Sequence, residues 1–403
     1  MSEQPGHGPR SLADATTMQV GGEVTTWVEA STRDEVAAAY AAAIDDDYTP
    51  LLLLGGGSNT VASSEPFDGT VLHVATRGIR TLPPAERPHR PPGEEPPADD
   101  SVVLRVEAGE GWDALVAQTV ADGLAGLEAL SGIPGSVGAA PIQNIGAYGQ
   151  EVASTLLGIE LLTRGEHGEL EVRWVPAAEL RLGYRESAIK RGLLRGVVLS
   201  VDFRLRRSAD GRSQPIAYQQ LATALGVDLG TRVPLDDLRA AVLELRRSKG
   251  MVLSDDADSV SAGSFFTNPV VSARFAATLP EDAPRWSMSP QPSAVVVPLD
   301  HAAAVDGAGV DAAGLDALPP LDRPVPQVKL SAAWLIERSG IGRGFSLPGS
   351  RAAISSKHTL ALTNRGGATG EQVAELARFV QARVENQFGV HLVPEPVLVG
   401  LPL

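Results

Sequence analysis

The spacing of hydrophobic and polar residues predicts alternating strands and helices near the start of the chain. Thr32 and Glu35 stand three residues apart ahead of an alanine-rich stretch, which predicts a capped helix running through Ala43. The four leucines at Leu51–Leu54 are bounded by turn residues and predict a strand buried on both faces. A short strand is also expected near Val20 and at 27–29, so the region from Thr16 to Val74 has a βαββ-like order.

The rest of the chain also alternates between strand-like and helix-like spacing of apolar residues. The expected elements, in chain order, are strand 102–108, helix 112–124, strands 156–163, 171–175 and 196–205, helix 235–247, and a helix from Thr369 that Gly389 ends. The apolar residues of the helix at 112–124 fall on one face, and the last of them is Leu124. Arg246 and Arg247 end the helix at 235–247, as suits a helix C-terminus. No internal repeat is visible.

Three stretches lack the composition of a folded core. Residues 1–10 are expected to form a flexible tail. Residues 83–100 are dense in proline and charge and predict a solvated loop or insertion. Residues 278–326 are rich in Pro, Ala and Asp around one apolar segment, 294–299, where we expect a strand within an elaboration. A chain of 403 residues exceeds a single core, so two or three domains are expected.

Composition argues against several classes of function. The chain has no Cys, which excludes disulfides, thiolate catalysis and thiolate-ligated metal sites. The seven His residues are scattered singly, so no metal centre is expected. The net charge of −15 argues against nucleic-acid binding, which needs a basic face. No apolar run has the length of a membrane span or the pattern of a leader, so we expect a cytoplasmic protein without a membrane partner, and no obligate protein partner is evident.

Lysine is rare, and nearly all of the positive charge is arginine. The four lysines are Lys190, Lys249, Lys329 and Lys357. A lysine retained in such a composition can mark a position that needs a compact ammonium charge. The alternative is chance survival on the surface, which we favour for Lys357.

Two glycine-rich segments predict a close approach of the backbone to a ligand. Residues 131–149 read SGIPGSVGAAPIQNIGAYG, and the strand at 51–54 runs directly into GGGSN. Such segments let main-chain N–H groups reach an anionic group, such as a pyrophosphate. Gln143, Asn144 and Tyr148 would then orient what is bound. The alternatives are a turn-rich loop for the first segment and a tight hairpin for the second.

A third pair of glycines, Gly109 and Gly111, lies between an expected strand and an expected helix, as in a Rossmann fingerprint. That fingerprint requires a second strand ending in an acidic residue about twenty residues further on. Here the helix runs instead into 131–149, and Trp112 and Asp113 would crowd a pyrophosphate. We therefore reject a Rossmann site.

Six motifs occur together in one order along the chain. They are GGGSN at 55–59, GIPGSVGAAPIQNIGAYG at 132–149, YRESAIK at 184–190, SAGSFFTNP at 261–269, VKLSAAWLIE at 328–337 and PEPVLVG at 394–400. Together they resemble the UDP-N-acetylenolpyruvoylglucosamine reductases, flavoenzymes of peptidoglycan precursor synthesis, over roughly residues 12–400. The run QPIAYQQL around Tyr218 is similar to the subtype with an inserted substrate-binding Tyr loop.

The resemblance implies an α+β fold of two FAD-binding subdomains of the vanillyl-alcohol-oxidase (PCMH) type and a C-terminal α+β substrate-binding domain. The implied divisions are a tail at 1–10, subdomain 1 at 11–82, a Pro-rich loop at 83–100, subdomain 2 at 101–225, the substrate-binding domain at 226–390 with its expansion at 278–326, and a C-terminal segment at 391–403. The last segment carries the catalytic glutamate of the family.

The resemblance also implies FAD as the cofactor, NADPH as the reductant and UDP-N-acetylglucosamine enolpyruvate as the substrate. The implied cofactor-binding residues are Gly55, Gly56, Gly57, Ser58, Asn59, Gly132, Ile133, Pro134, Gly135, Ser136, Gly138 and Ala139. Neither loop contains Lys or Arg, so main-chain amides would hold the FAD pyrophosphate. We expect residues 143–148 to lie near the flavin or the substrate.

Three catalytic residues follow from the same resemblance. Arg185 matches the family arginine and would offer a cationic fork to the substrate carboxylate. Ser264 matches the serine that protonates the enolate left by hydride addition, and Glu395 matches the glutamate that acts beside the arginine. The alternatives are a surface arginine, a capping serine and a solvated acid.

Five residues are implied in substrate binding: Tyr218, Arg246, Lys249, Asn268 and Lys329. Tyr218, Lys249 and Asn268 match family groups that contact the diphosphate, and Lys249 stands in an R-x-x-K stretch that begins at Arg246. For Lys329 we favour a role in closing the substrate domain, with structural pairing as the alternative.

The chain departs from the family pattern at two places. Pro396 and Val397 stand where many members have Val and Arg, and Thr267 stands where a Lys is common. Any contact that the arginine makes with the diphosphate or uracil is therefore absent here, and both changes are expected to affect affinity for the uridine diphosphate. Two other functions remain open at this point: another FAD-dependent oxidoreductase of the same fold with a different substrate, and a flavin- or nucleotide-sugar-binding regulator without catalysis.

Overall fold

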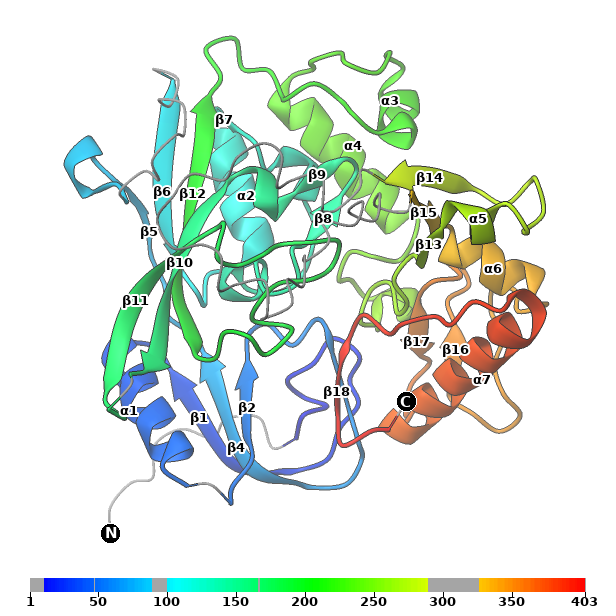
Figure 1. The fold of residues 1–403 in the computed structure, drawn as a ribbon, viewed down its shortest axis with the longest axis horizontal. Coiled ribbons are helices and arrows are strands. Elements are labelled where there is room, and N and C mark those ends of the chain that lie inside the picture. The colour runs from blue at the N-terminus through cyan, green and yellow to red at the C-terminus, as the bar shows by residue number, and fades with distance from the viewer. Residues whose placement is uncertain (1–10, 47, 89–99, 166, 289–325, 403) are drawn as a thin grey trace, which may run out of the picture. The chain divides into compact units, whose positions relative to one another are not determined.

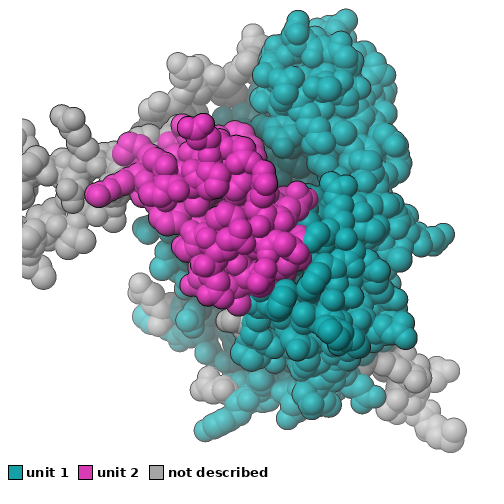
Figure 2. All heavy atoms as spheres, turned by 90° about the vertical axis from the view of Figure 1, so that its right-hand side faces the viewer, with its two compact units in different colours: residues 1–265, 342–379, 394–403 teal, residues 266–341, 380–393 magenta. Residues whose placement is uncertain are grey.

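The computed structural model describes residues 11–46, 48–88, 100–165, 167–288 and 326–402. They divide into two compact units, coloured teal and magenta in Figure 2. Unit 1 comprises Met1–Phe265, Gly342–Phe379 and Pro394–Leu403, and unit 2 comprises Phe266–Ile341 and Val380–Val393. The tail expected at 1–10, most of the loop at 83–100 and the expansion around 294–299 lie outside the described residues.

The first sheet of unit 1 is parallel and three-stranded, in the order β1 (Val24–Ala30), β4 (Phe67–Val74), β2 (Leu51–Leu54). Helix α1 (Arg33–Ile44) contacts β1 and β4 and begins with the predicted capping box, in which Thr32 and Glu35 exchange hydrogen bonds (Figure 1). The prediction that Leu51–Leu54 is buried on both faces is wrong. These leucines form an edge strand, and the Leu53 side chain is 39% exposed because no further strand or helix of the described chain covers it.

The second sheet of unit 1 is antiparallel and six-stranded. Its path is β11 (Leu170–Pro176), β10 (Leu156–Arg164), β12 (Val197–Arg207), β6 (Ser101–Glu107) and β5 (Ile79–Thr81), with β7 (Leu124–Ala125) paired to the end of β12. The strands expected at 102–108, 156–163, 171–175 and 196–205 are confirmed to within two residues at each end.

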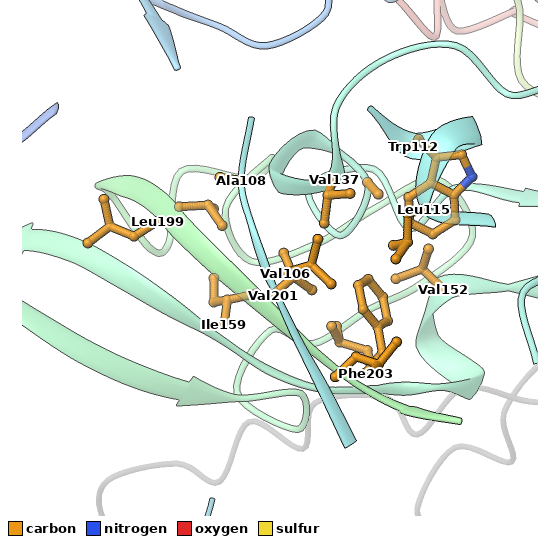
Figure 3. Packing of buried hydrophobic residues seen from close by; sticks show 14 of the residues in the cluster. Val106, Ala108, Trp112, Leu115, Val137, Val152, Ile159, Leu199, Val201 and Phe203 are labelled. Carbon is orange, nitrogen blue, oxygen red and sulfur yellow. The ribbon is translucent and has the colours of Figure 1, made fainter. Parts of the chain in front are cut away.

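Helix α2 (Trp112–Ala121) packs its apolar face into the core beside this sheet. Trp112 meets Phe203 of β12 edge to face, with ring centroids 6.0 Å apart, and its indole N–H donates to the Leu130 carbonyl at 3.1 Å. Figure 3 shows these side chains gathered with Leu115 in one cluster. The helix is shorter than predicted: it ends before Gly123, and Leu124 is buried in β7 instead of on the helix.

Charged side chains link helix α1 to the second sheet of unit 1. Arg33, at the start of α1, contacts Glu107 of β6 and Glu160 of β10. Arg105 contacts Glu160 at 2.7 Å and Asp202 of β12 at 2.8 Å. Bidentate arginine contacts of this kind fix orientation as well as contributing energy. The first helix is therefore tied to the centre of the second sheet.

The remaining elements that lie wholly in unit 1 are short apart from one helix of 13 residues. They are β3 (Thr60–Ala62), β8 (Gly146–Ala147), β9 (Gln150–Glu151), α3 (Gln219–Leu225), α4 (Leu235–Arg247), β16 (Ala352–Ile354), β17 (Leu362–Asn364) and β18 (Val397–Val399). Helix α4 has the predicted bounds. Strand β18 pairs in parallel with β3, directly after the glycine loop at 55–59, and so brings the end of the chain to the beginning of unit 1.

Unit 2 contains an antiparallel sheet of three strands, in the order β13 (Val270–Ser272), β15 (Gln327–Leu330), β14 (Arg285–Met288), together with α5 (Ala273–Ala276) and α6 (Ala332–Arg338). Helix α7 (Gly370–Phe388) belongs to unit 1 up to Phe379 and to unit 2 beyond it, and has the predicted Thr369 cap. The mixture of separate helices and mainly antiparallel strands is that of an α+β protein. Within the described part of the chain, none of the helices combines the length and the apolar character needed to cross a membrane.

Candidate active site

The C-terminal segment places Glu395 inside unit 1, against the first glycine loop. The Glu395 N–H donates to the Phe265 carbonyl at 2.8 Å, and the Val397 N–H donates to the Asn59 carbonyl at 2.8 Å. Pro396 lies between these two hydrogen bonds, so its missing N–H leaves both anchors intact. The Glu395 side chain is only 15% exposed.

Arg185 pairs with this carboxylate. Its Nε lies 3.1 Å from Oε1 of Glu395, while Nη1 and Nη2 donate to the carbonyls of Asn144 (3.3 Å) and Gly146 (2.6 Å). Arg185, Asn144 and Tyr148 all have a positive φ, between 43° and 58°. Side chains other than glycine rarely adopt this conformation, and such residues cluster at functional sites. The guanidinium is therefore held in place by backbone carbonyls.

Gln143 connects the glutamate to the glycine loop. Its Nε2 donates to Oε1 of Glu395 at 2.7 Å, and its Oε1 accepts from Nδ2 of Asn59 at 2.6 Å. Asn59 Nδ2 also lies 3.2 Å from the Glu395 carbonyl oxygen. The Gln143 amide and the Arg185 guanidinium thus meet at the carboxylate, and Asn59 supports the group through the Gln143 amide and the Glu395 backbone.

Burial and charge act on Glu395 in opposite directions. Burial raises the pKa of the Glu395 carboxyl, and this outweighs the lowering by Arg185, Gln143 and Lys190. Burial likewise lowers the pKa of the Lys190 ammonium, although Glu395 and Glu186 oppose that change. A carboxyl with a raised pKa beside a fixed cation can hold a proton closer to neutral pH than an exposed one.

Ser264 lies close to this group along the backbone. It directly precedes Phe265, whose carbonyl accepts the Glu395 N–H. Ser264 is half-buried, and its hydroxyl has no hydrogen-bond partner among the residues that the structure describes. The hydroxyl is therefore available to a ligand.

The two glycine loops touch each other. A Cβ on Gly56 would lie 2.7 Å from Cα of Gly135, and a Cβ on Gly135 would lie 2.7 Å from Oγ of Ser58. Ser58 Oγ also donates to the Pro134 carbonyl at 3.0 Å. Backbone meets backbone here, so the glycines are needed for this packing as well as for any ligand.

Several N–H groups on these loops are open to a ligand. In the described part of the chain, the backbone N–H groups of residues 55–59, 135 and 136 donate to no protein acceptor. In contrast, the Gly132 N–H donates to Oδ1 of Asp113 at 2.6 Å, and that of Gly138 donates to the Ala108 carbonyl. Open N–H groups on two adjoining loops without acidic side chains suit an anionic group such as a pyrophosphate.

Three of the implied substrate-binding residues lie together in unit 1. The Tyr218 ring meets the Tyr148 ring edge to face at 5.8 Å, and Nζ of Lys249 lies 5.4 Å from the Tyr148 centroid. Arg246 is buried, and no described residue accepts from its Nε. Burial lowers the pKa of both Lys249 and Arg246. Tyr218 is 44% exposed, so this cluster faces solvent on one side.

Asn268 and Lys329 belong to unit 2 and are described within it. Asn268 Oδ1 accepts from the Ala332 N–H at 3.0 Å, at the start of α6. Lys329 lies in β15, with Nζ 6.0 Å from the Trp286 ring centroid.

Sequence reasoning did not assign a direct contact to several residues of this site. Gln143 was expected only to orient a ligand, and it contacts Glu395 directly. Lys190 was noted for its rarity alone, and it reaches the carbonyl of Arg185 at 3.2 Å. Asp113 holds the Gly132 N–H and pairs with Arg239 of α4 at 2.6 Å. The low lysine content was the signal for Lys190, whereas no local pattern marked Asp113.

Comparison with known proteins supports a common origin along the whole chain. Residues 255–399 match the model of the UDP-N-acetylenolpyruvoylglucosamine reductase C-terminal domain, and residues 25–171 match an FAD binding domain. The UDP-N-acetylenolpyruvoylglucosamine reductase of Leifsonia xyli is 53% identical over 98% of this chain and 99% of its own length. That of Saccharopolyspora erythraea is 45% identical over 98% of this chain and 96% of its own.

A solved structure agrees with the fold. The UDP-N-acetylenolpyruvylglucosamine reductase of Thermus caldophilus aligns over 96% of this chain and 97% of its own, with a TM-score of 0.55 at 23% identity. The predicted FAD-binding fold with a C-terminal α+β domain is confirmed by this likeness and by the two domain matches. The chain belongs to the UDP-N-acetylenolpyruvoylglucosamine reductase family and is an FAD-dependent oxidoreductase.

Proposed function

We propose that this protein reduces the enolpyruvyl ether of UDP-N-acetylglucosamine enolpyruvate to UDP-N-acetylmuramate, with NADPH as the reductant. The observation that carries the proposal is the Arg185–Glu395 pair, 3.1 Å apart and largely shielded from solvent. An enolpyruvyl carboxylate needs a fixed cation to bind it and an acid near the carbon that becomes basic. The relatives named above carry out a reduction of this nucleotide according to their names, which supports the same substrate here.

The cofactor would lie against the two glycine loops. The open N–H groups of residues 55–59, 135 and 136 would hold the pyrophosphate, since no cation is present in either loop. The chemistry that FAD would supply when bound is hydride transfer from NADPH to the enolpyruvyl double bond. The chain itself would hold the substrate within reach of the cofactor.

Arg185 orients the substrate carboxylate. A guanidinium has five N–H donors, and three of those of Arg185 are engaged with Glu395, Asn144 and Gly146. Two donors therefore remain for the substrate, in a plane fixed by the protein. As the hydride adds to the methylene carbon, negative charge develops on the adjacent carbon and its carboxylate, and the cation stabilises that charge.

Ser264 completes the reduction. Its Oγ donates a proton to the adjacent carbon, so that the double bond gains one hydride and one proton and becomes a lactyl ether. Glu395 would hold a replacement proton close by, because burial raises the pKa of its carboxyl. Tyr218, Arg246 and Lys249 form a cluster in unit 1 that would bind the diphosphate. For Asn268 and Lys329 the proposed role in substrate binding rests on the family motifs alone.

The Ser264→Ala variant tests the proton donor. Removing a general acid typically costs about 10² to 10⁴-fold in rate, so we expect that loss in the conversion of the enolpyruvyl nucleotide. Reduction of the bound flavin by NADPH should be unchanged, because that half-reaction needs no proton from Ser264. The measurement is single-turnover kinetics of the two half-reactions. Normal conversion by the variant would remove Ser264 from this role and leave the family assignment intact.

The proposed substrate is tested by product analysis. Wild-type protein supplied with NADPH and the enolpyruvyl nucleotide should yield a nucleotide heavier by two hydrogen atoms, as read by mass spectrometry. Consumption of NADPH with the nucleotide recovered unchanged would assign the reducing activity to another substrate.

A further inference from the structure

Lys190 has no part in the mechanism proposed above, yet it adjoins two of its residues. It lies on the segment that carries Arg185, and its Nζ reaches the Arg185 carbonyl at 3.2 Å. The same Nζ lies 3.5 Å from Oε1 of Gln143. The residue as a whole is exposed, but its ammonium is directed toward these two acceptors, and partial burial lowers its pKa.

The donors around Gln143 fix which way its amide points. Both Asn59 Nδ2 and Lys190 Nζ approach the Gln143 Oε1 atom, at 2.6 Å and 3.5 Å. An ammonium and an amide nitrogen can only donate there, so the oxygen of the Gln143 amide must face them. Its NH2 group is therefore turned toward Glu395, 2.7 Å from Oε1.

The two protein donors to the Glu395 carboxylate share one oxygen. Arg185 Nε and Gln143 Nε2 both approach Oε1, at 3.1 Å and 2.7 Å. No described residue donates to Oε2. A proton on this carboxyl would meet two donors at Oε1 and none at Oε2, so Oε2 is the oxygen that can carry it.

We propose that Lys190 is a positioning residue for Glu395. Together with Asn59 it fixes the orientation of the Gln143 amide, and this orientation directs the exchangeable proton of Glu395 to Oε2. The positive charge of Lys190 also weakens the binding of that proton. This inference rests on the proposed function, in which Glu395 replaces the proton that Ser264 gives up. Lys190 touches neither substrate nor reacting atoms in this account and acts through its neighbours.

The charges around Glu395 determine the expected sign. Arg185 and Lys190 are the cations that act on the carboxyl, and Glu186 acts on Lys190 from the same segment. The segments carrying Gln143 and Asn59 contribute amides, and the segment at 265 contributes a backbone carbonyl that accepts the Glu395 N–H. Removing the cation at 190 favours the neutral carboxyl, so the pKa of Glu395 rises.

The test is a titration of Glu395 in the flavin-loaded protein without substrate. Carbon-13 NMR of glutamate-labelled protein follows the carboxyl, and Glu395→Gln assigns its signal. Lys190→Met should raise the midpoint by about 1 pH unit, as expected for the loss of a nearby opposite charge. Lys190→Arg keeps the charge and should stay near wild type. Lys357→Met is the matched control, because Lys357 pairs with Asp256 and with no residue of this site.

An unchanged midpoint in Lys190→Met, or an equal shift in Lys190→Arg, overturns the inference. Flavin absorbance and melting temperature show that each variant is folded, and Lys190→Gln carries the same test if the methionine variant does not fold. A shift of the midpoint in a protein that fails to reduce the enolpyruvyl nucleotide supports the role of Lys190 and rejects the proposed function. Normal turnover with no shift rejects the role of Lys190 alone.

Discussion

Gly56 and Gly135 are required where the two glycine loops touch, because the backbone of one lies directly against the backbone of the other. The sequence suggested a different reason for these glycines, the approach of a ligand. Both reasons apply to the same loops: contact on one side, and open N–H groups at 55–59, 135 and 136. A side chain at either glycine would separate the loops and disturb the donors.

The Gly56→Ala variant tests whether the contact between the two glycine loops is needed for FAD binding. The added Cβ would lie 2.7 Å from Cα of Gly135, so one loop must move. We expect a protein that folds but binds less FAD, measured as the ratio of flavin to protein absorbance. Gly342→Ala is the control, because a Cβ there meets open space. Full flavin content in Gly56→Ala would show that the contact between the loops does not matter for binding.

At the scale of elements, hydrogen bonds between segments distant in sequence hold the site together. Strand β18 pairs with β3, which fixes Glu395 next to Asn59, and Asp113 at the start of α2 holds the Gly132 N–H. Glu371, in the first turn of α7, stabilises the turn after β3 through hydrogen bonds. Its Oε1 accepts from Ser63 Oγ (2.8 Å) and the Ser64 N–H (2.9 Å), and Oε2 accepts from Ser64 Oγ (2.8 Å).

The hydrogen bonds to the Glu371 carboxylate predict how the stability of the folded protein depends on pH. Burial acts to raise the pKa of Glu371, but hydrogen bonds from Ser63 and Ser64 outweigh it and bring the pKa to about 2. The folded protein therefore favours the ionised form, and this stabilisation is present above the unfolded pKa near 4.5 and fades as pH falls toward 2.

We expect Glu371→Gln to lower the free energy of unfolding by about 0.5–1 kcal/mol at neutral pH, a value reduced for solvent screening at this exposed site. The difference from wild type should shrink as the pH is lowered below 4.5. Urea unfolding at several pH values measures it, with Glu375→Gln on the same helix as control. A difference that is constant with pH would contradict the assignment to the charged carboxylate.

Local patterns allowed the sequence to predict most of these elements but not the contacts between them. The Thr32–Glu35 box marked α1, and apolar spacing marked α4 and α7 because these signals lie within a few residues. The burial of Leu51–Leu54 was mispredicted because apolar composition does not reveal whether a strand lies at a sheet edge. Arg185, Ser264 and Glu395 were predicted one by one from family motifs. The contacts of Arg185 and Glu395 with Gln143 and Lys190 were not predicted, because residues up to 252 positions apart share no local sequence pattern.

At the scale of the whole molecule, the three candidate catalytic residues and the two glycine loops belong to the same unit. Unit 1 holds both glycine loops, the Arg185–Glu395 pair and Ser264. An acidic protein of net charge −15 can still bind an anionic cofactor there, because local N–H groups, not the net charge, set the field at the loops.

FAD binding should therefore slow amide hydrogen exchange locally within unit 1. With FAD at 100 times its Kd, the bound state is stabilised by about 2.7 kcal/mol, so amide exchange through openings that release FAD should slow about 100-fold. Hydrogen exchange read by mass spectrometry should show this at 55–59 and 132–139, and α6 of unit 2 serves as the internal reference. Protection confined to α6 would contradict the placement of the cofactor.

The most direct test of the central claim is the reoxidation of the reduced protein by its proposed substrate. The purified protein is reduced anaerobically with NADPH until the flavin absorbance is bleached, and the enolpyruvyl nucleotide is then added. We expect the oxidised flavin spectrum to return as the nucleotide is reduced, at a rate that falls about 10² to 10⁴-fold in Ser264→Ala. A colourless protein, or a flavin that stays reduced when the nucleotide is added, would contradict it.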